Sequence, residues 1–192
     1  MIQLFLRVKH WQLFVLTFGV LLVAEIVWIV DIFDGLYQSM EYEIYMEELV
    51  SNMTGLFLVA GFSMLIIYGW IWSIGVGMQR YIPDDLKMNT SFFTFAIIFP
   101  ILFFVFYMWF IRQLIITEFD INPFVFLLFV PFILFVAFCS FYTYWFAGKA
   151  IKTAELQRKV RFSDFMAEFF LFWFYPVGVW IIQPNIKKIM EK

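Results

Sequence analysis

The chain has little charge and almost none of the side chains that build metal or disulfide sites. Of its 192 residues, 15% are charged, one is cysteine (Cys139) and one is histidine (His10). A single cysteine excludes a disulfide framework and a zinc ribbon, and six prolines without a period exclude a collagen-like repeat. The sequence therefore predicts no catalytic residue, no metal site and no cofactor.

Apolar surface is what the chain has in excess. Hydrophobic residues make up 64% of it, 29 residues are phenylalanine, and the mean hydropathy is +0.88. Soluble chains are about 45–50% apolar and about 25% charged, so a soluble domain of this size would be unable to cover so much apolar surface. The composition predicts a polytopic integral membrane protein whose solvent is the lipid bilayer.

Four apolar stretches are long enough to cross a membrane, which takes about 20 helical residues for about 30 Å of hydrocarbon. They cover residues 11–30, 56–76, 92–111 and 124–146. The first is too long for a cleavable signal sequence and is expected to stay in the membrane. The predicted fold is all-α, with residues 1–192 forming a single four-helix transmembrane bundle.

A further apolar stretch, residues 162–182, is expected to enter the membrane without crossing it. Two acidic residues lie in its first third, and Pro176-Val177-Gly178 interrupts it. A crossing would also carry the three lysines that follow to the other side. We therefore expect a C-terminal re-entrant or interfacial helical element, with Ser163 as its N-cap and Phe165–Tyr175 as its buried arm. A fifth span is the alternative.

The distribution of Lys and Arg predicts the orientation. Of the thirteen, only Arg112 borders the side opposite to both termini. Because loops rich in Lys and Arg stay in the cytoplasm, both termini are expected to be cytoplasmic. The outer side carries residues 31–50, an acidic segment without a basic residue, in which Leu36, Met40 and Ile44 recur at a spacing that predicts a short amphipathic helix.

Glu25 is the carboxylate that lies well inside a predicted span. Leaving it unpaired in hydrocarbon costs at least about 2–3 kcal/mol, so we expect a partner for it. Arg112, at the end of the third span on the same side, is the candidate, and the two would form a buried ionisable pair. A protonated, hydrogen-bonded Glu25 and a transport role for Glu25 are the other interpretations.

Small residues form a stripe on the second span. Gly69, Ser73 and Gly77 recur at a spacing of four, and such stripes let helices approach closely in lipid. The stripe predicts a helix-packing interface, either within the chain or with another subunit or copy.

Basic residues gather near the C-terminus and are candidates for contact with anionic lipids, at about 1 kcal/mol per charge. They are Lys149, Lys152, Arg158, Lys159, Arg161, Lys187 and Lys188. Topology alone explains the same charges. Nucleic-acid binding is not expected, because spans lie on either side of the basic loops.

Two stretches carry a family resemblance. Trp70–Gln79 and the tail Trp173–Pro184, with its pattern Pro-x-Gly-x-Trp-x-x-Gln-Pro, resemble small multi-span membrane proteins of Bacteroidota-type bacteria. The resemblance implies a bacterial inner-membrane location and brings with it no activity, substrate or site residue.

These features favour a non-enzymatic membrane protein that acts by interaction, as an accessory or structural subunit of an inner-membrane assembly. Its partners would be other membrane subunits or a second copy of the chain. The alternative is a small carrier or channel formed by oligomerisation, with Glu25 lining the path. The third and fourth spans are rich in Phe almost all round, which favours interaction over a pore. A lipid-acting enzyme is the least favoured function.

Overall fold

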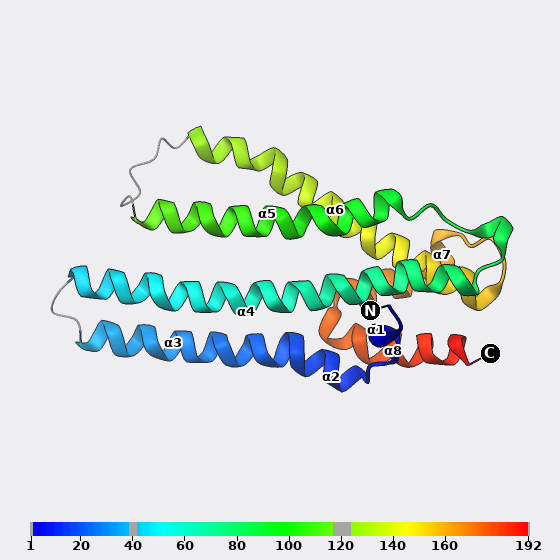
Figure 1. Cartoon of the computed structure of the whole chain (residues 1–192), viewed down its shortest axis with the longest axis horizontal. Coiled ribbons are helices and arrows are strands. Elements are labelled where there is room, and N and C mark those ends of the chain that lie inside the picture. Colours follow the sequence, from blue (N-terminus) through cyan, green and yellow to red (C-terminus); the bar gives the residue numbers. More distant parts are fainter. Residues whose placement is uncertain (1, 39–41, 117–123, 192) are drawn as a thin grey trace.

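A computed structural model describes the backbone of residues 2–38, 42–116 and 124–191, and the side chains of these ranges apart from 34–38, 42–52, 115–116 and 125–126. The regular structure of this part of the chain is entirely helical (Figure 1). The elements in chain order are α1 (Ile2–Arg7), α2 (His10–Phe14), the π-helical turn η1 (Val15–Gly19), α3 (Val20–Gln38), α4 (Tyr42–Gly77), the 3-10 turns η2 (Met78–Tyr81) and η3 (Asp84–Leu86), α5 (Ser91–Ile116), α6 (Phe124–Leu156), α7 (Phe162–Trp173) and α8 (Tyr175–Met190).

Four helical stretches of the described chain are long and apolar enough to cross a membrane: His10–Phe33, Met53–Tyr81, Ser91–Leu114 and Leu127–Leu156. Each overlaps one predicted span, which confirms the all-α membrane bundle. α4 lies between α3 and α5 (Figure 1). Both termini lie toward the same end of the bundle, which we call the terminal end, and the α3–α4 and α5–α6 connections mark the opposite, loop end.

Residues 31–50 do not form the separate amphipathic helix that their spacing predicts. α3 continues to Gln38 and α4 begins at Tyr42, so the described part of this segment extends the two flanking helices. Extending a helix adds one hydrogen bond for each residue ordered, whereas starting a new helix orders several residues for one bond. No proline stands in the segment to stop the extension.

The C-terminal stretch folds into a helical hairpin, α7–α8, that enters the bundle from the terminal end (Figure 1). α7 ends at Trp173, Phe174 leaves the helical conformation (φ −89°, ψ 57°), and α8 begins with Pro176 in its first turn. α7 has 12 residues and is therefore about 18 Å long, little more than half of a hydrocarbon core of about 30 Å. The expected re-entrant element is present, and its break lies beside the proline that predicted it.

The start of α7 is fixed by Asp164, whereas Ser163, the expected N-cap, lies inside the helix. The N-cap is Arg161, whose backbone N–H donates to the Asp164 carboxylate at 2.8 Å. This bond, assisted by the guanidinium of Arg158, holds the pKa of Asp164 below its usual range. The stabilisation is therefore present above the ordinary pKa of aspartate and is lost as the pH falls through the lowered value.

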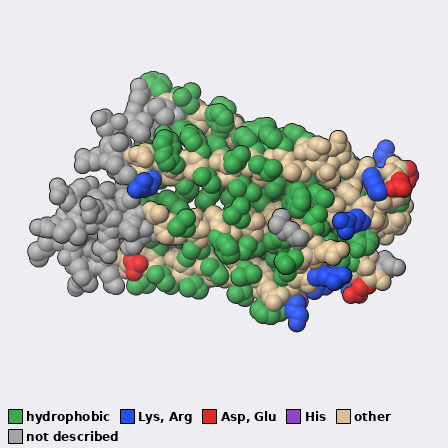
Figure 2. Space-filling model, in the orientation of Figure 1, with side chains coloured by type: hydrophobic (Ala, Val, Ile, Leu, Met, Phe, Trp, Pro, Cys, Tyr) green, Lys and Arg blue, Asp and Glu red, His purple; other side chains and the backbone are tan. Residues whose placement is uncertain are grey.

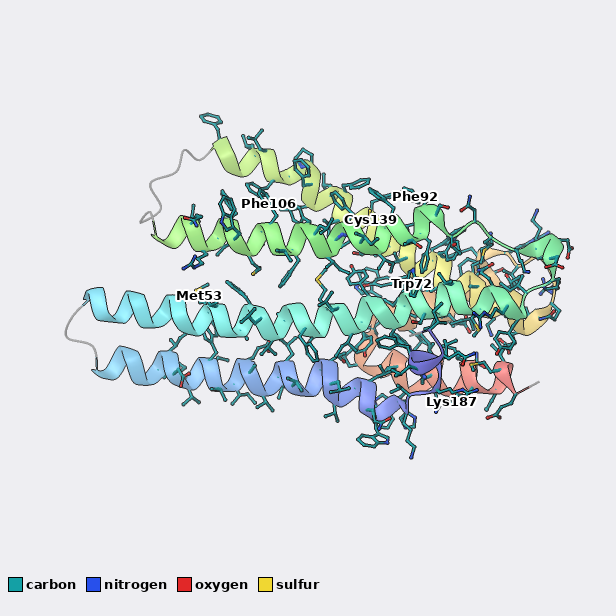
Figure 3. The ribbon with its side chains drawn as sticks, viewed as in Figure 1. Met53, Trp72, Phe92, Phe106, Cys139 and Lys187 are labelled. Carbon is teal, nitrogen blue, oxygen red and sulfur yellow. The ribbon has the colours of Figure 1, made fainter. Side chains whose placement is uncertain are left out.

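The packed core lies in the terminal half. In the most apolar 18-residue window of the second span, 33% of the residues are buried. The corresponding shares in the first, third and fourth spans are 11%, 17% and 11%, so α4 is the central helix. Figure 3 shows side chains crowded between the helices toward the end where Lys187 lies. The largest fully buried side chains include Trp70, Phe93, Phe165, Phe172, Met78 and Gln183.

Replacing Gly178 by alanine is expected to destabilise the hairpin. A Cβ atom at this position would overlap the carbonyl oxygen of Leu171, a backbone atom of α7 that has no side-chain freedom to move aside. The expected loss is about 1–3 kcal/mol or more, measured by thermal unfolding in detergent. Gly148→Ala is the matched control, because its Cβ would meet α7 atoms at an ordinary 3.4 Å. Equal losses in the two variants would contradict this account.

Candidate functional site

The side-chain amide of Gln183, in α8, joins three helices in the packed half. Its nitrogen donates to the backbone carbonyls of Phe5, Leu6 and Val8 at 3.0, 3.0 and 2.9 Å, so two hydrogens are shared among three acceptors. Its oxygen accepts from the indole N–H of Trp70, in α4, at 2.8 Å. The side chains of Gln183 and Trp70 are both fully buried. A single amide therefore connects α8 with α1 and α4.

The local sequence explains why a glutamine stands there. The last carbonyl groups of a helix have no partner inside it, and α1 has only six residues. The Gln183 amide supplies the missing donors from a neighbouring helix. The stretches Trp70–Gln79 and Trp173–Pro184, which carry the family resemblance, are thus the ones that meet at this amide.

A second polar cluster surrounds Thr17, in the π-helical turn η1. The Thr17 hydroxyl donates to the carbonyl of Leu13 at 2.7 Å and is hydrogen bonded to the hydroxyl of Tyr175, at the start of α8, at 3.0 Å. Ser63 of α4 donates its hydroxyl hydrogen to the Thr17 carbonyl at 3.1 Å. A π turn interrupts the regular hydrogen bonding of the α-helix, and these hydroxyls compensate for it. The hairpin is thereby attached to the first and second spans.

We call these two clusters the polar junction: Gln183, Trp70, Thr17, Ser63 and Tyr175. Its hydrogen-bonding side chains are amide, indole and hydroxyl groups that are bonded to one another and to backbone carbonyls, so what the arrangement does is hold helices together. Sequence reasoning did not single out these residues as a site. The available signal was an amide and hydroxyls within apolar segments, where an unsatisfied polar group is costly.

The small-residue stripe of α4 is the surface on which α1 packs. Gly69 faces the ring of Phe5, and Gly77 faces Leu6 so closely that a Cβ atom would displace it. Ser73 is fully buried and its hydroxyl donates to the carbonyl of Gly69 at 2.7 Å. Of the two interfaces that the stripe predicts, the structure places the intramolecular one here.

The structure does not bring Glu25 and Arg112 together. Glu25 lies on α3 and Arg112 on α5, with α4 between them, and both side chains are exposed (Figure 1). The half-buried positions Leu21, Ala24 and Trp28 are the side of α3 that packs on α4, which leaves Glu25 on the outside. Within the described side chains neither residue has an ion-pair partner, so the expected pair is not formed.

The basic residues proposed to contact anionic lipids lie at the terminal end, where Figure 2 shows most Lys and Arg side chains gathered. Lys152 is held between two carboxylates, Glu155 at 2.8 Å and the buried Glu168 of α7 at 3.0 Å. Arg158 pairs with Asp164 at 3.4 Å. These two cations are thus engaged within the chain. Lipid contact stays a prediction for all seven residues, of which Lys149, Lys159, Arg161, Lys187 and Lys188 form none of these ion pairs.

The remaining residues with reactive side chains are packed singly. Cys139 is buried in α6, and the ring of His10 lies against Trp180 with a centroid distance of 4.5 Å. Over the described ranges, no three His, Cys, Asp or Glu side chains are grouped as a metal ion would require.

Comparisons with protein-family models, curated proteins and solved structures return no match. The function must therefore be inferred from this chain's own residues.

Gln183→Leu is expected to destabilise the terminal half, because it leaves the Trp70 N–H and the carbonyls of α1 without partners. Each unsatisfied buried group costs about 1–3 kcal/mol. Trp70→Phe removes the donor, so the double variant should be less destabilised than the sum of the single variants, by about 0.5–3 kcal/mol. Thermal unfolding of the four proteins in detergent measures this difference. Strict additivity would show that the bond contributes nothing.

Proposed function

We propose that the protein acts by interaction, as an accessory or structural subunit of a bacterial inner-membrane assembly, and that it is not an enzyme. One observation carries the proposal. Glu25 is an ionisable side chain on the lipid-facing side of a span, and no other described side chain forms an ion pair with it. A second membrane protein at this position would supply the partner that the described side chains do not.

The depth of Glu25 gives this observation its weight. In the span His10–Phe33, Glu25 lies about 12 Å along the helix from Phe33 and about 22 Å from His10. A carboxylate at such depth costs about 2.5–3.5 kcal/mol on insertion scales unless a partner neutralises it. Because Glu25 points away from the bundle, it supports a contact with another helix better than a path through this chain.

The surroundings of Glu25 suit a neighbouring helix. Leu22, Ile26, Ile29 and Phe33 recur beside it at helical spacing, with exposed fractions between 41% and 67%. We call these residues and Glu25 the outer face of α3. An apolar stripe with one charge favours a membrane-spanning helix that carries a Lys, Arg or His at the same depth.

Photo-crosslinking tests the partner. A photoreactive amino acid at Ile26, on the outer face of α3, should give one discrete protein adduct in native membranes, and Glu25→Leu should abolish it by removing the charge. Leu134 of α6, which is 65% exposed, is the control position and should give no protein adduct.

An adduct that survives Glu25→Leu, or equal adducts at both positions, would contradict the proposed contact. An adduct of twice the chain's mass would show that the partner is a second copy of the chain and not another protein with a basic residue.

The proposed orientation places the terminal end in the cytoplasm, which the excess of Lys and Arg at that end supports. Asn89 is exposed at this end, and Gln38 belongs to the loop end. In a Cys139→Ala background, Gln38→Cys should react with a membrane-impermeant maleimide on cells whose inner membrane is intact. Asn89→Cys should react only after that membrane is opened. The reverse pattern would overturn the orientation.

A further inference from the structure

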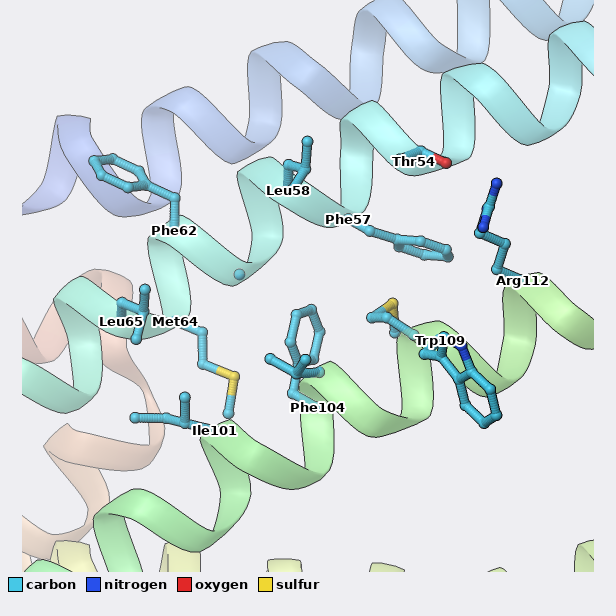
Figure 4. A pocket seen from close by; sticks show the side chains of 13 residues that line it. Thr54, Phe57, Leu58, Phe62, Met64, Leu65, Ile101, Phe104, Trp109 and Arg112 are labelled. Atoms are coloured by element: carbon cyan, nitrogen blue, oxygen red, sulfur yellow. The ribbon is translucent and has the colours of Figure 1, made fainter.

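An apolar groove runs between α4 and α5 in the loop half of the bundle (Figure 4). Its volume is about 480 Å³, and its walls include Phe57 and Met64 of α4 and Phe104 and Met108 of α5. Gly61 contributes no side chain to the wall, and a Cβ atom there would already meet the Phe104 ring at 3.2 Å. The side chains of the two spans and the space beside Gly61 therefore form the groove.

The length of the groove matches one leaflet of a bilayer. On α5 it extends from Ile101 to Arg112 and on α4 from Thr54 to Leu65. Eleven residues of α-helix rise about 16 Å, close to half of a hydrocarbon core of about 30 Å. The groove therefore reaches from the boundary at the loop end to about the middle of the membrane.

The lining of the groove suits a hydrocarbon occupant. Apart from Thr54 and Arg112 at one end, the side chains that line it are apolar, and they follow the two spans for about 16 Å. An apolar channel of this length along the membrane normal suits an extended acyl chain.

The outer end of the groove carries a cation. Figure 4 shows the side chain of Arg112 extending from α5 toward Thr54 of α4, across the mouth of the groove. No carboxylate among the described side chains pairs with Arg112. Trp109, one turn earlier, also lines the groove and is of the residue type that gathers at headgroup depth. A guanidinium binds phosphate through two parallel hydrogen bonds.

We propose that this groove binds one acyl chain of an anionic phospholipid from the leaflet at the loop end, with the lipid phosphate on Arg112. The site is separate from the basic residues of the terminal end. It is also independent of the proposed partner contact, because the outer face of α3 lies on the other side of α4.

Native mass spectrometry of the full chain in detergent tests the site, with phosphatidylglycerol and phosphatidylcholine added in parallel at matched acyl chains. The wild-type protein should retain one phosphatidylglycerol molecule more strongly than phosphatidylcholine. Arg112→Gln should weaken phosphatidylglycerol binding about tenfold, to the level of phosphatidylcholine, as expected for the loss of a charged hydrogen bond. Arg7→Gln, which removes an exposed charge at the terminal end, should leave binding unchanged.

A second variant tests the groove itself. Val105 lines the groove and is 62% exposed, so Val105→Trp should fill it and weaken both lipids. Val27→Trp, at a 54% exposed position on α3, is the matched control and should have no effect.

Thermal unfolding of each variant separates loss of binding from loss of fold. Equal retention of the two lipids by the wild type, or full binding by folded Arg112→Gln, would overturn the proposal. Tighter binding of a free fatty acid than of phosphatidylglycerol would overturn the assignment to a phospholipid.

Discussion

The buried amide of Gln183 is the interaction on which the terminal half depends. α1 is six residues long, and a helix of that length has too few internal hydrogen bonds to be stable alone. It is held by the glycine stripe of α4 on one side and by the Gln183 amide at its carboxyl end. The same amide accepts from Trp70, so it also fixes α8 against α4. Without it, a buried indole and several carbonyls would lack partners at once.

Because of this anchoring, the terminal half and the loop half of the molecule are packed differently. The terminal half has a protein-like core, in which the α7–α8 hairpin fills the space between the spans. The hairpin does not fill the loop half, where the α4–α5 groove and the outer face of α3 are open. A re-entrant element that reaches only about halfway therefore determines where binding surfaces are left open.

The structural features that the sequence predicts best are those that depend on the length and composition of a single segment. The spans follow from apolar runs, and the hairpin follows from Pro176 together with the lysines after it. The extent of α3 and α4 is missed, because the spacing of Leu36, Met40 and Ile44 predicts one helix, whereas Leu36 belongs to α3 and Ile44 to α4. The polar junction is missed because Gln183 and Trp70 are 113 residues apart. The pairing of Glu25 with Arg112 rests on depth alone, and depth does not tell which way each side chain points around its helix.

Separating Glu25 and Arg112 has a physical consequence for both. Paired within the chain, they would neutralise each other, whereas on opposite sides of α4 neither finds an ion-pair partner among the described side chains. Glu25 and Arg112 call for partners of different chemistry. An anionic phospholipid repels a carboxylate, so we propose a basic residue of another protein as the partner of Glu25, and the continuous outer face of α3 has room for a helix. Arg112 stands at the mouth of an apolar groove, where we propose that the phosphate of a lipid neutralises it. In these two proposals one charge recruits protein and the other recruits lipid, because α4 keeps them apart.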